Sequence, residues 1–240
     1  MEFNCISDIG LLRNINQDSY LTVRNEYGDF LAIVADGIGG GKAGEVASGE
    51  VVKYFKDIFE KSGPFKKLDD AINFIQYHIN NINRKVFEMS LSDSKYSGMG
   101  TTLTGLLITS KGTLSINCGD SRVYGFLDNK IFPLTNDHTL VNQMLEKGQI
   151  SYEESLNHPK RHYLVRAIGI YNFVNADVHK VKNMNYYLIC SDGLHGYVSD
   201  AEICEIINSK SSLQDKTNEL KDLALLKGGY DNVTIILIEK

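Results

Sequence analysis

The sequence predicts an α+β fold, and two observations carry that prediction. Strand-like and helical segments are grouped in runs along the chain, whereas in a parallel α/β fold they alternate one by one. The turns that break the strand-like stretch 101–134 are too short for the crossover that joins two parallel strands. We therefore expect helices packed on largely antiparallel sheets, with residues 101–134 forming one antiparallel meander.

The first half of the chain changes once from a strand-like pattern of apolar residues to a helical one. Apolar runs predict three strands, at 2–8, 19–25 and 29–35. The third strand leads into a glycine-rich loop at 37–41, where glycine permits backbone geometry that is closed to other residues. Apolar positions then repeat every three or four residues, which predicts two amphipathic helices, at 43–59 and 68–87.

The second half returns to strands and ends on helices and a strand. Within 101–134 the breaks fall at 110–112, 119–120 and 128–129. A helix is expected at 139–148, followed by an irregular surface segment at 149–172 that contains Pro159 and has few periodic apolar residues. The remaining predicted elements are strands at 174–181 and 185–191, helices at 199–208 and 212–227, and a strand at 232–239.

Composition and charge narrow the class of protein. The chain has 240 residues, of which 42% are hydrophobic and 23% charged, so it is long enough to bury a core. We find no repeat, low-complexity tract or linker, and expect one domain over residues 1–240. The net charge is −5 and no block of Lys or Arg is present, which argues against a nucleic-acid partner.

Cysteine usage and the apolar runs bear on location. The four cysteines are widely spaced, form no Cys-x-x-Cys pair, and are expected to be reduced; they are Cys5, Cys118, Cys190 and Cys204. No signal-peptide core opens the chain, and no apolar run approaches the roughly 18 residues of a membrane span. The expected location is the cytoplasm, with no membrane partner.

Four aspartates stand at the ends of apolar, strand-like runs: Asp36, Asp120, Asp192 and Asp231. A carboxylate at the end of a buried strand is costly unless it is paired or bound to a metal ion. An isolated Asp-Gly step is most often a turn, but four such positions together favour one cluster of hard oxygen ligands. The sequence therefore predicts chemistry that depends on divalent cations.

Seven motifs follow one another along nearly the whole chain. They are SDIGLLRNINQD at 7–18, VADGIGG at 34–40, MGTTL at 99–103, GDSRVY at 119–124, LTNDH at 134–138, CSDGL at 190–194 and GGYDNVT at 228–234. One such block would be weak evidence, whereas seven in order are specific. The set resembles the metal-dependent Ser/Thr protein phosphatases of the type-2C family, in particular its small bacterial members.

The resemblance implies a fold and a metal site. The fold is a four-layer sandwich, in which two largely antiparallel sheets are flanked on each side by helices. Asp36 is similar to the carboxylate that bridges two Mg²⁺ or Mn²⁺ ions. The Gly37 carbonyl would bind the first ion, and Asp192 and Asp231 the second. Asp120, together with Asp192, is similar to the ligands of a possible third ion.

The resemblance also implies a reaction and its partners. Arg13 matches the residue that grips the substrate phosphate, and Asp18 matches an acid that holds a metal-bound water. The implied activity is hydrolysis of phosphoserine and phosphothreonine in proteins by direct attack of a water that bridges the ions. The expected partners are phosphorylated proteins and a cognate Ser/Thr kinase, and the expected form is a monomer.

The chain departs from the family at one position that bears on chemistry. Family members carry a His after Asp-Gly or after Asp-Gly-Met-Gly-Gly, the candidate general acid, and this chain has Ile38 and Gly41 there. Metal-bound water, Lys42 or His138 would then donate the proton, or aryl phosphates would be better substrates. Two alternatives stay open: a phosphoprotein-binding regulator without turnover, and a two-metal nuclease.

Two further expectations concern the remaining histidines and the variable segment. His78, His158, His162, His179 and His195 have no partner at ligand spacing and are expected to be surface or packed residues, although His195 closely follows Asp192. Residues 143–170 resemble the family's variable flap. Within the flap, Lys160, Arg161 and Arg166 could favour acidic or phosphorylated sequences.

Overall fold

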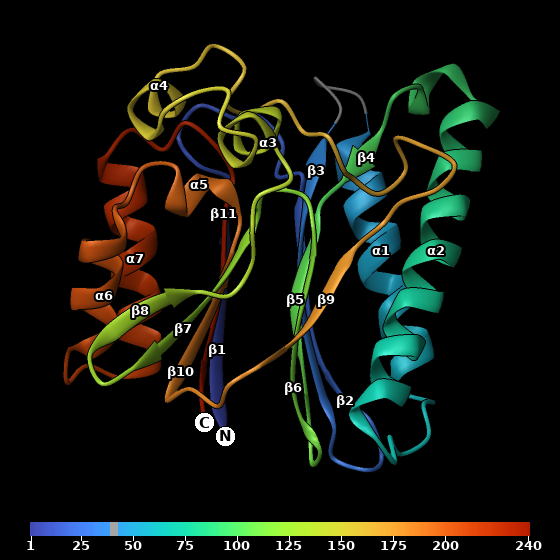
Figure 1. The fold of residues 1–240 in the computed structure, drawn as a ribbon, viewed down its shortest axis with the longest axis horizontal. Coiled ribbons are helices and arrows are strands. Elements are labelled where there is room, and N and C mark those ends of the chain that lie inside the picture. The colour runs from blue at the N-terminus through green and yellow to red at the C-terminus, as the bar shows by residue number, and fades with distance from the viewer. Residues whose placement is uncertain (39–42) are drawn as a thin grey trace.

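The strands assemble into two antiparallel sheets that stack face to face, with helices on the outer face of each (Figure 1). The computed structural model describes residues 1–38 and 43–240. Its layers are helix, sheet, sheet and helix, which confirms the predicted α+β four-layer sandwich. None of the helices in the described ranges combines the length and apolar character needed to cross a membrane.

The first sheet carries the helices that follow the glycine loop. Its strand order is β2 (Asp18–Arg24), β3 (Phe30–Ile38), β5 (Leu103–Thr109), β6 (Gly112–Cys118) and β9 (Asp177–Val181), and the short β4 (Gly100–Thr101) pairs with β3. Helices α1 (Gly44–Phe59) and α2 (Leu68–Ser92) cover its outer face, and a 3₁₀ turn, η1 (Ser94–Tyr96), follows them.

The second sheet brings the two termini together. Its strand order is β1 (Glu2–Asp8), β11 (Val233–Glu239), β10 (Tyr186–Cys190), β7 (Arg122–Leu127) and β8 (Lys130–Pro133). Helices α6 (Asp200–Asn208) and α7 (Leu213–Leu226) cover its outer face, and α5 (Asp192–His195) follows β10 directly. The short helices α3 (Leu140–Glu146) and α4 (Tyr152–Leu156) lie at the top of the molecule in Figure 1.

Alternation along β3 shows why its end carries chemistry. Successive side chains of a strand point to opposite faces, so Leu31 and Ile33 pack under the helices while Phe30, Ala32 and Val34 pack between the sheets. A strand that is buried on both faces reads as a continuous apolar run, as observed. By the same alternation, Asp36 faces the space between the two sheets.

The predicted single meander over 101–134 is wrong. Strands β5 and β6 pair in the first sheet, whereas β7 and β8 pair in the second, so the chain changes sheets between Cys118 and Arg122. Gly119 permits this crossing, because its φ is +131° and a Cβ there would lie 2.5 Å from Thr102 Cγ2. The crossing places Asp120 at the edge between the sheets.

Other differences from the predicted elements are local. The segment 149–172 contains α4, which a capping box between Ser151 and Glu154 supports despite its length of five residues. Helix α5 has only four residues and shows no periodicity that a sequence window could detect. The four cysteines are free, as expected.

Candidate metal centre

The strand ends surround a cavity of about 260 Å³. Its lining includes most of the residues that the sequence and the family resemblance singled out: Arg13, Asp36, Gly37, Asp120, Asp192 and Asp231. These residues come from five separate stretches of the chain. The fold therefore brings the four predicted aspartates to one place.

Two hydrogen bonds with Thr102 fix the backbone of Asp36 at the end of β3. Its N–H donates to Thr102 Oγ1 (2.9 Å), and its carbonyl accepts from the Thr102 N–H (2.8 Å). Gly37 follows in a crowded position, where a Cβ would lie 2.4 Å from the Gly44 carbonyl oxygen. No side chain fits there, and Gly37 itself lines the cavity.

Asp18 is the partner of Asp36 across the sheet. The two residues are directly opposite in the register of β2 and β3, so their side chains share the face between the sheets. The Ser191 hydroxyl donates to Asp18 Oδ2 (2.7 Å) and accepts from the Thr234 N–H (2.9 Å). Ser191, which directly precedes Asp192, thus links Asp18 in the first sheet to Thr234 in the second.

Burial, together with neighbouring carboxylates, raises the pKa of four aspartates at this site, Asp18, Asp36, Asp120 and Asp192. Burial raises the pKa of Asp18 to about 6 and that of Asp120 to about 7. Burial also raises the pKa of Asp36 and Asp192 well above the usual value, and the neighbouring aspartates raise both further. The folded protein therefore holds repelling charges that a cation would neutralise.

The donor set fits hard divalent cations. Asp18 Oδ1 and Asp192 Oδ1 are buried and have no hydrogen-bond partner in the described part of the chain. A buried oxygen without a partner is costly, and carboxylate and carbonyl oxygens are the ligands that Mg²⁺ and Mn²⁺ prefer. The residues present thus suit the divalent cations that the sequence predicted.

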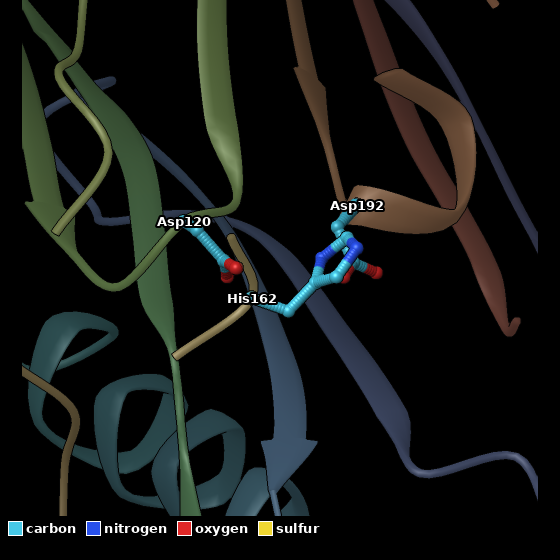
Figure 2. Close-up of side chains that lie close together, drawn as sticks. All are labelled: Asp120, His162 and Asp192. Carbon is cyan, nitrogen blue, oxygen red and sulfur yellow. The ribbon is translucent and has the colours of Figure 1, made fainter. Parts of the chain in front are cut away.

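His162 is an exposed residue, as expected, and its ring also lies close to two of the aspartates. Ligand atoms of Asp120, His162 and Asp192 lie within 4.8 Å of one another, and Figure 2 shows the imidazole beside the two carboxylates. His162 belongs to the irregular flap segment, so no spacing in the sequence could connect it to either aspartate. It is a possible third ligand beside the two carboxylates.

Arg13 lies on the rim of the cavity and contacts a carboxylate. Its Nη2 donates to Asp231 Oδ2 (2.6 Å), and its Nε donates to the Tyr230 carbonyl (3.3 Å). The Arg13 side chain is 48% exposed, and an ion pair this accessible to water contributes at most about 1 kcal/mol. Exchange of the carboxylate for a phosphate group would therefore cost little.

Asn232 holds the loop that carries Arg13, and the sequence analysis missed this role. Its Oδ1 accepts from the Gln17 N–H (2.8 Å), while its Nδ2 donates to the carbonyls of Ile9 (2.8 Å) and Ile15 (3.1 Å). Asn232 is 4% exposed. The one available signal was its place next to Asp231 in the last motif.

His138 does not serve as a proton donor to the cavity. The Gly119 N–H donates to its Nδ1 (3.2 Å), and its Nε2 lies 3.1 Å from Asp177 Oδ2 and 3.2 Å from Arg166 Nη1, so both ring nitrogens are engaged by groups that do not line the cavity. Burial lowers the pKa of His138, which keeps the ring neutral. Its role is structural: it ties the Gly119 turn to the strand β9. Lys42, the other residue considered for proton transfer, lies outside the described residues, as does Gly41, which stands where relatives carry the His.

Comparison with known proteins identifies the family. The family model described as Protein phosphatase 2C matches residues 13–224. The chain belongs to the protein phosphatase 2C family. The match spans both sheets and includes Arg13, Asp36, Asp120 and Asp192.

Curated and solved members of the phosphatase 2C family match over almost the full length. The serine/threonine phosphatase stp of Listeria welshimeri is 34% identical over 236 residues, which are 98% of this chain and 94% of that protein. Protein phosphatase PhpP of Streptococcus pneumoniae is 32% identical, covering 99% and 97%. The crystal structure of serine/threonine phosphatase Stp1 from Staphylococcus aureus superposes with a TM-score of 0.94 at 34% identity, covering 100% and 94%.

Stability of this phosphatase 2C protein without metal is expected to depend on pH through Asp120. Because the pKa of Asp120 is raised, the folded state binds its proton more tightly than the unfolded state does. Protonated Asp120 therefore stabilises the fold at low pH, and this contribution is lost as pH rises through about 7. Asn at this position does not titrate. In the presence of a chelator, the melting temperature of Asp120→Asn should exceed that of the wild type slightly at pH 5 and by about 5 °C at pH 8.

The comparison is made between two variants at each pH, so that contributions of the buried histidines cancel. A melting-temperature difference that stays constant from pH 5 to pH 8 would contradict the raised pKa of Asp120. Saturating Mn²⁺ should abolish the advantage of Asp120→Asn, because the ion neutralises the carboxylate.

Proposed function

We propose that this protein is a Mn²⁺- or Mg²⁺-dependent phosphatase that hydrolyses phosphoserine and phosphothreonine in proteins. The observation that carries the proposal is the convergence of Asp36, Asp120, Asp192 and Asp231 on one cavity whose rim holds Arg13. Family membership and relatives named as serine/threonine phosphatases support the same reaction. A Ser/Thr kinase that phosphorylates the same proteins is the partner that this activity implies, and we propose that the enzyme acts as a monomer.

The residues that would hold the ions follow from the cavity. Asp36 and the Gly37 carbonyl would bind one ion, Asp36 would also reach the second, and Asp192 and Asp231 would complete it. Asp120, with Asp192 and His162, would hold a third ion. When bound, a pair of divalent ions lowers the pKa of a shared water toward neutrality and offsets the charge of the phosphoryl oxygens.

The protein's own groups would position the substrate and the attacking water. Arg13 offers a planar guanidinium at the rim, a geometry that matches two phosphate oxygens and that Lys cannot supply. Asp18 is not among the residues that line the cavity. Ser191 fixes its Oδ2, and its buried Oδ1 has no hydrogen-bond partner among the described residues, so a water that reached Oδ1 would be held there. Attack by water on phosphorus requires no covalent phosphoenzyme.

The direct test uses one phosphothreonine peptide and p-nitrophenyl phosphate, each with Mn²⁺, with Mg²⁺ and with a chelator. Turnover of both substrates with either ion, and none with the chelator, is the expected result. Tight binding of the peptide without turnover would favour the alternative of a phosphoprotein-binding regulator. Cleavage of DNA or RNA in place of phosphopeptide would favour a nuclease, which the net charge of −5 argues against.

The leaving group should matter more here than in relatives that carry the loop His. Ile38 cannot donate a proton, and both ring nitrogens of His138 are engaged away from the cavity, so a serine or threonine alkoxide would depart with less assistance. General-acid catalysis is typically worth about 10²–10⁴ in rate. We expect kcat for p-nitrophenyl phosphate to exceed kcat for an alkyl phosphate of the same charge by about 10²-fold or more. Equal efficiency and equal pH–rate profiles for the two would show that a donor is present.

A further inference from the structure

A second cavity of about 320 Å³ opens beside the metal centre. Asp120, His162 and Asp192 line both cavities, so the two adjoin. The far side of the second cavity is formed by helices α3 and α4, at the top of the molecule in Figure 1. We name this cavity the flap pocket. Its volume is at the low end of ligand pockets, which hold about 300–1,000 Å³.

The helices give the flap pocket an apolar wall. Val141 and Leu145 line it from α3, and Tyr152 and Leu156 line it from α4. Residues four apart lie on one face of a helix, so each pair presents a continuous apolar strip. Tyr152 and Leu156 are 63% and 53% exposed. Large apolar side chains that stay exposed at the mouth of a cavity mark a site where a partner group can be buried.

Charged residues that line the flap pocket are paired with one another or lie next to the metal centre. Arg122 and Asp137 form a two-bonded ion pair (2.8 and 2.7 Å), so their charges cancel locally. Arg161 Nε donates to His162 Nε2 (2.9 Å) at the boundary with the metal centre. The carboxylates of Asp120 and Asp192 face the same boundary. The charged groups thus gather at the inner end, and the apolar groups gather at the outer end.

We propose that the flap pocket receives one apolar side chain, the size of Leu, Met or Phe, from the protein substrate. That side chain would stand within a few residues of the phosphorylated one, because the two cavities share a wall. The inference rests on the proposed phosphatase function and names the sequence feature that the enzyme would select. The alternative is that the flap arginines select acidic residues near the phosphorylated one. Peptides that carry Leu or Glu at the same positions distinguish the two preferences.

The experiment begins with the wild-type enzyme and a set of phosphothreonine peptides. A single Leu is moved through the three positions before and the three positions after phosphothreonine in an otherwise Ala and Ser background, and a second set carries Glu in the same positions. One Leu position should raise kcat/KM by about tenfold over the background peptide, as expected for an apolar group in a matching pocket. No gain at any Leu position, or a larger gain with Glu, would overturn the proposal.

The second step removes the α4 half of the apolar wall, keeps Val141 and Leu145 of α3, and leaves the metal centre unchanged. The variant is Tyr152→Ser/Leu156→Ser. Both wild-type side chains are exposed, so the fold should tolerate the change. A matched control is Tyr77→Ser/Leu91→Ser on α2, where the side chains are 64% and 72% exposed. The α4 variant should lose the tenfold preference for the Leu peptide, and the control should keep it.

Activity on p-nitrophenyl phosphate separates this proposal from the proposed function. That substrate is too small to reach the flap pocket, so its turnover should be equal in wild type, α4 variant and control. Absence of turnover in all three would refute the phosphatase function itself. Equal loss for both peptides and for p-nitrophenyl phosphate in the α4 variant alone would refute the pocket and assign α4 a general role at the metal centre.

Discussion

Replacing Asp36 by asparagine is expected to abolish Mn²⁺-dependent hydrolysis and, at the same time, to stabilise the metal-free protein. The carboxylate would hold both ions, and loss of several kcal/mol of charge stabilisation should lower kcat by about 10³-fold or more. The amide removes one of the charges that burial and the neighbouring aspartates make unfavourable. Hydrolysis of p-nitrophenyl phosphate and melting temperatures with and without Mn²⁺ measure the two effects.

The opposite signs make this prediction specific. A variant that merely unfolded would lose activity and stability together. Asp222→Asn is a matched control, because the Asp222 side chain is 66% exposed on α7, and it should change neither quantity. Retained Mn²⁺-dependent activity in Asp36→Asn, or an unchanged rise of its melting temperature with Mn²⁺, would contradict the metal assignment.

Replacing Asn232 by alanine should give the next largest effect. The change leaves one part-buried N–H and two carbonyls of the 9–17 loop without their partner, which costs about 1–3 kcal/mol in total. The loop carries Arg13, so its release should also raise KM for a phosphopeptide. Urea denaturation and steady-state kinetics measure the two changes.

Two comparisons show whether the effect on KM acts through the loop. Arg13→Ala should raise KM to a similar extent while changing stability little, since the Arg13 side chain is half exposed. Among the described residues the Asn208 amide donates only to Cys204 within α6, so Asn208→Ala should leave KM unchanged. A normal KM in Asn232→Ala together with a raised KM in Arg13→Ala would show that Asn232 does not position Arg13.

The sequence predicted the fold class because local patterns carry most of it. Alternating and three-to-four periodicities located the long helices and strands, and the apolar run before Asp36 predicted a strand there. Assignment of β7 to the second sheet was not predictable, because a short turn is compatible with a hairpin or with a crossing between sheets. At the crossing Gly119 has a φ of +131°, and the closely packed Thr102 leaves no room there for a Cβ, neither of which the local sequence pattern reveals.

The same distinction applies to the site. The aspartates could be predicted because each stands next to a strand end, where an unpaired charge needs a reason. His162 could not be predicted, because its approach to Asp120 and Asp192 depends on how the flap folds back over the sheet edge. Asn232 could not be assigned either, since its hydrogen bonds reach a loop 217 and 223 residues away in sequence.

The most direct test of the central claim is anomalous diffraction from crystals of the wild-type protein grown with Mn²⁺. We expect at least two Mn²⁺ peaks in the cavity lined by Asp36, Asp192 and Asp231, with Asp36 contacting both ions. Absence of Mn²⁺ from that cavity at saturating concentration, or ions bound only elsewhere, would contradict the claim that these carboxylates form a shared metal centre.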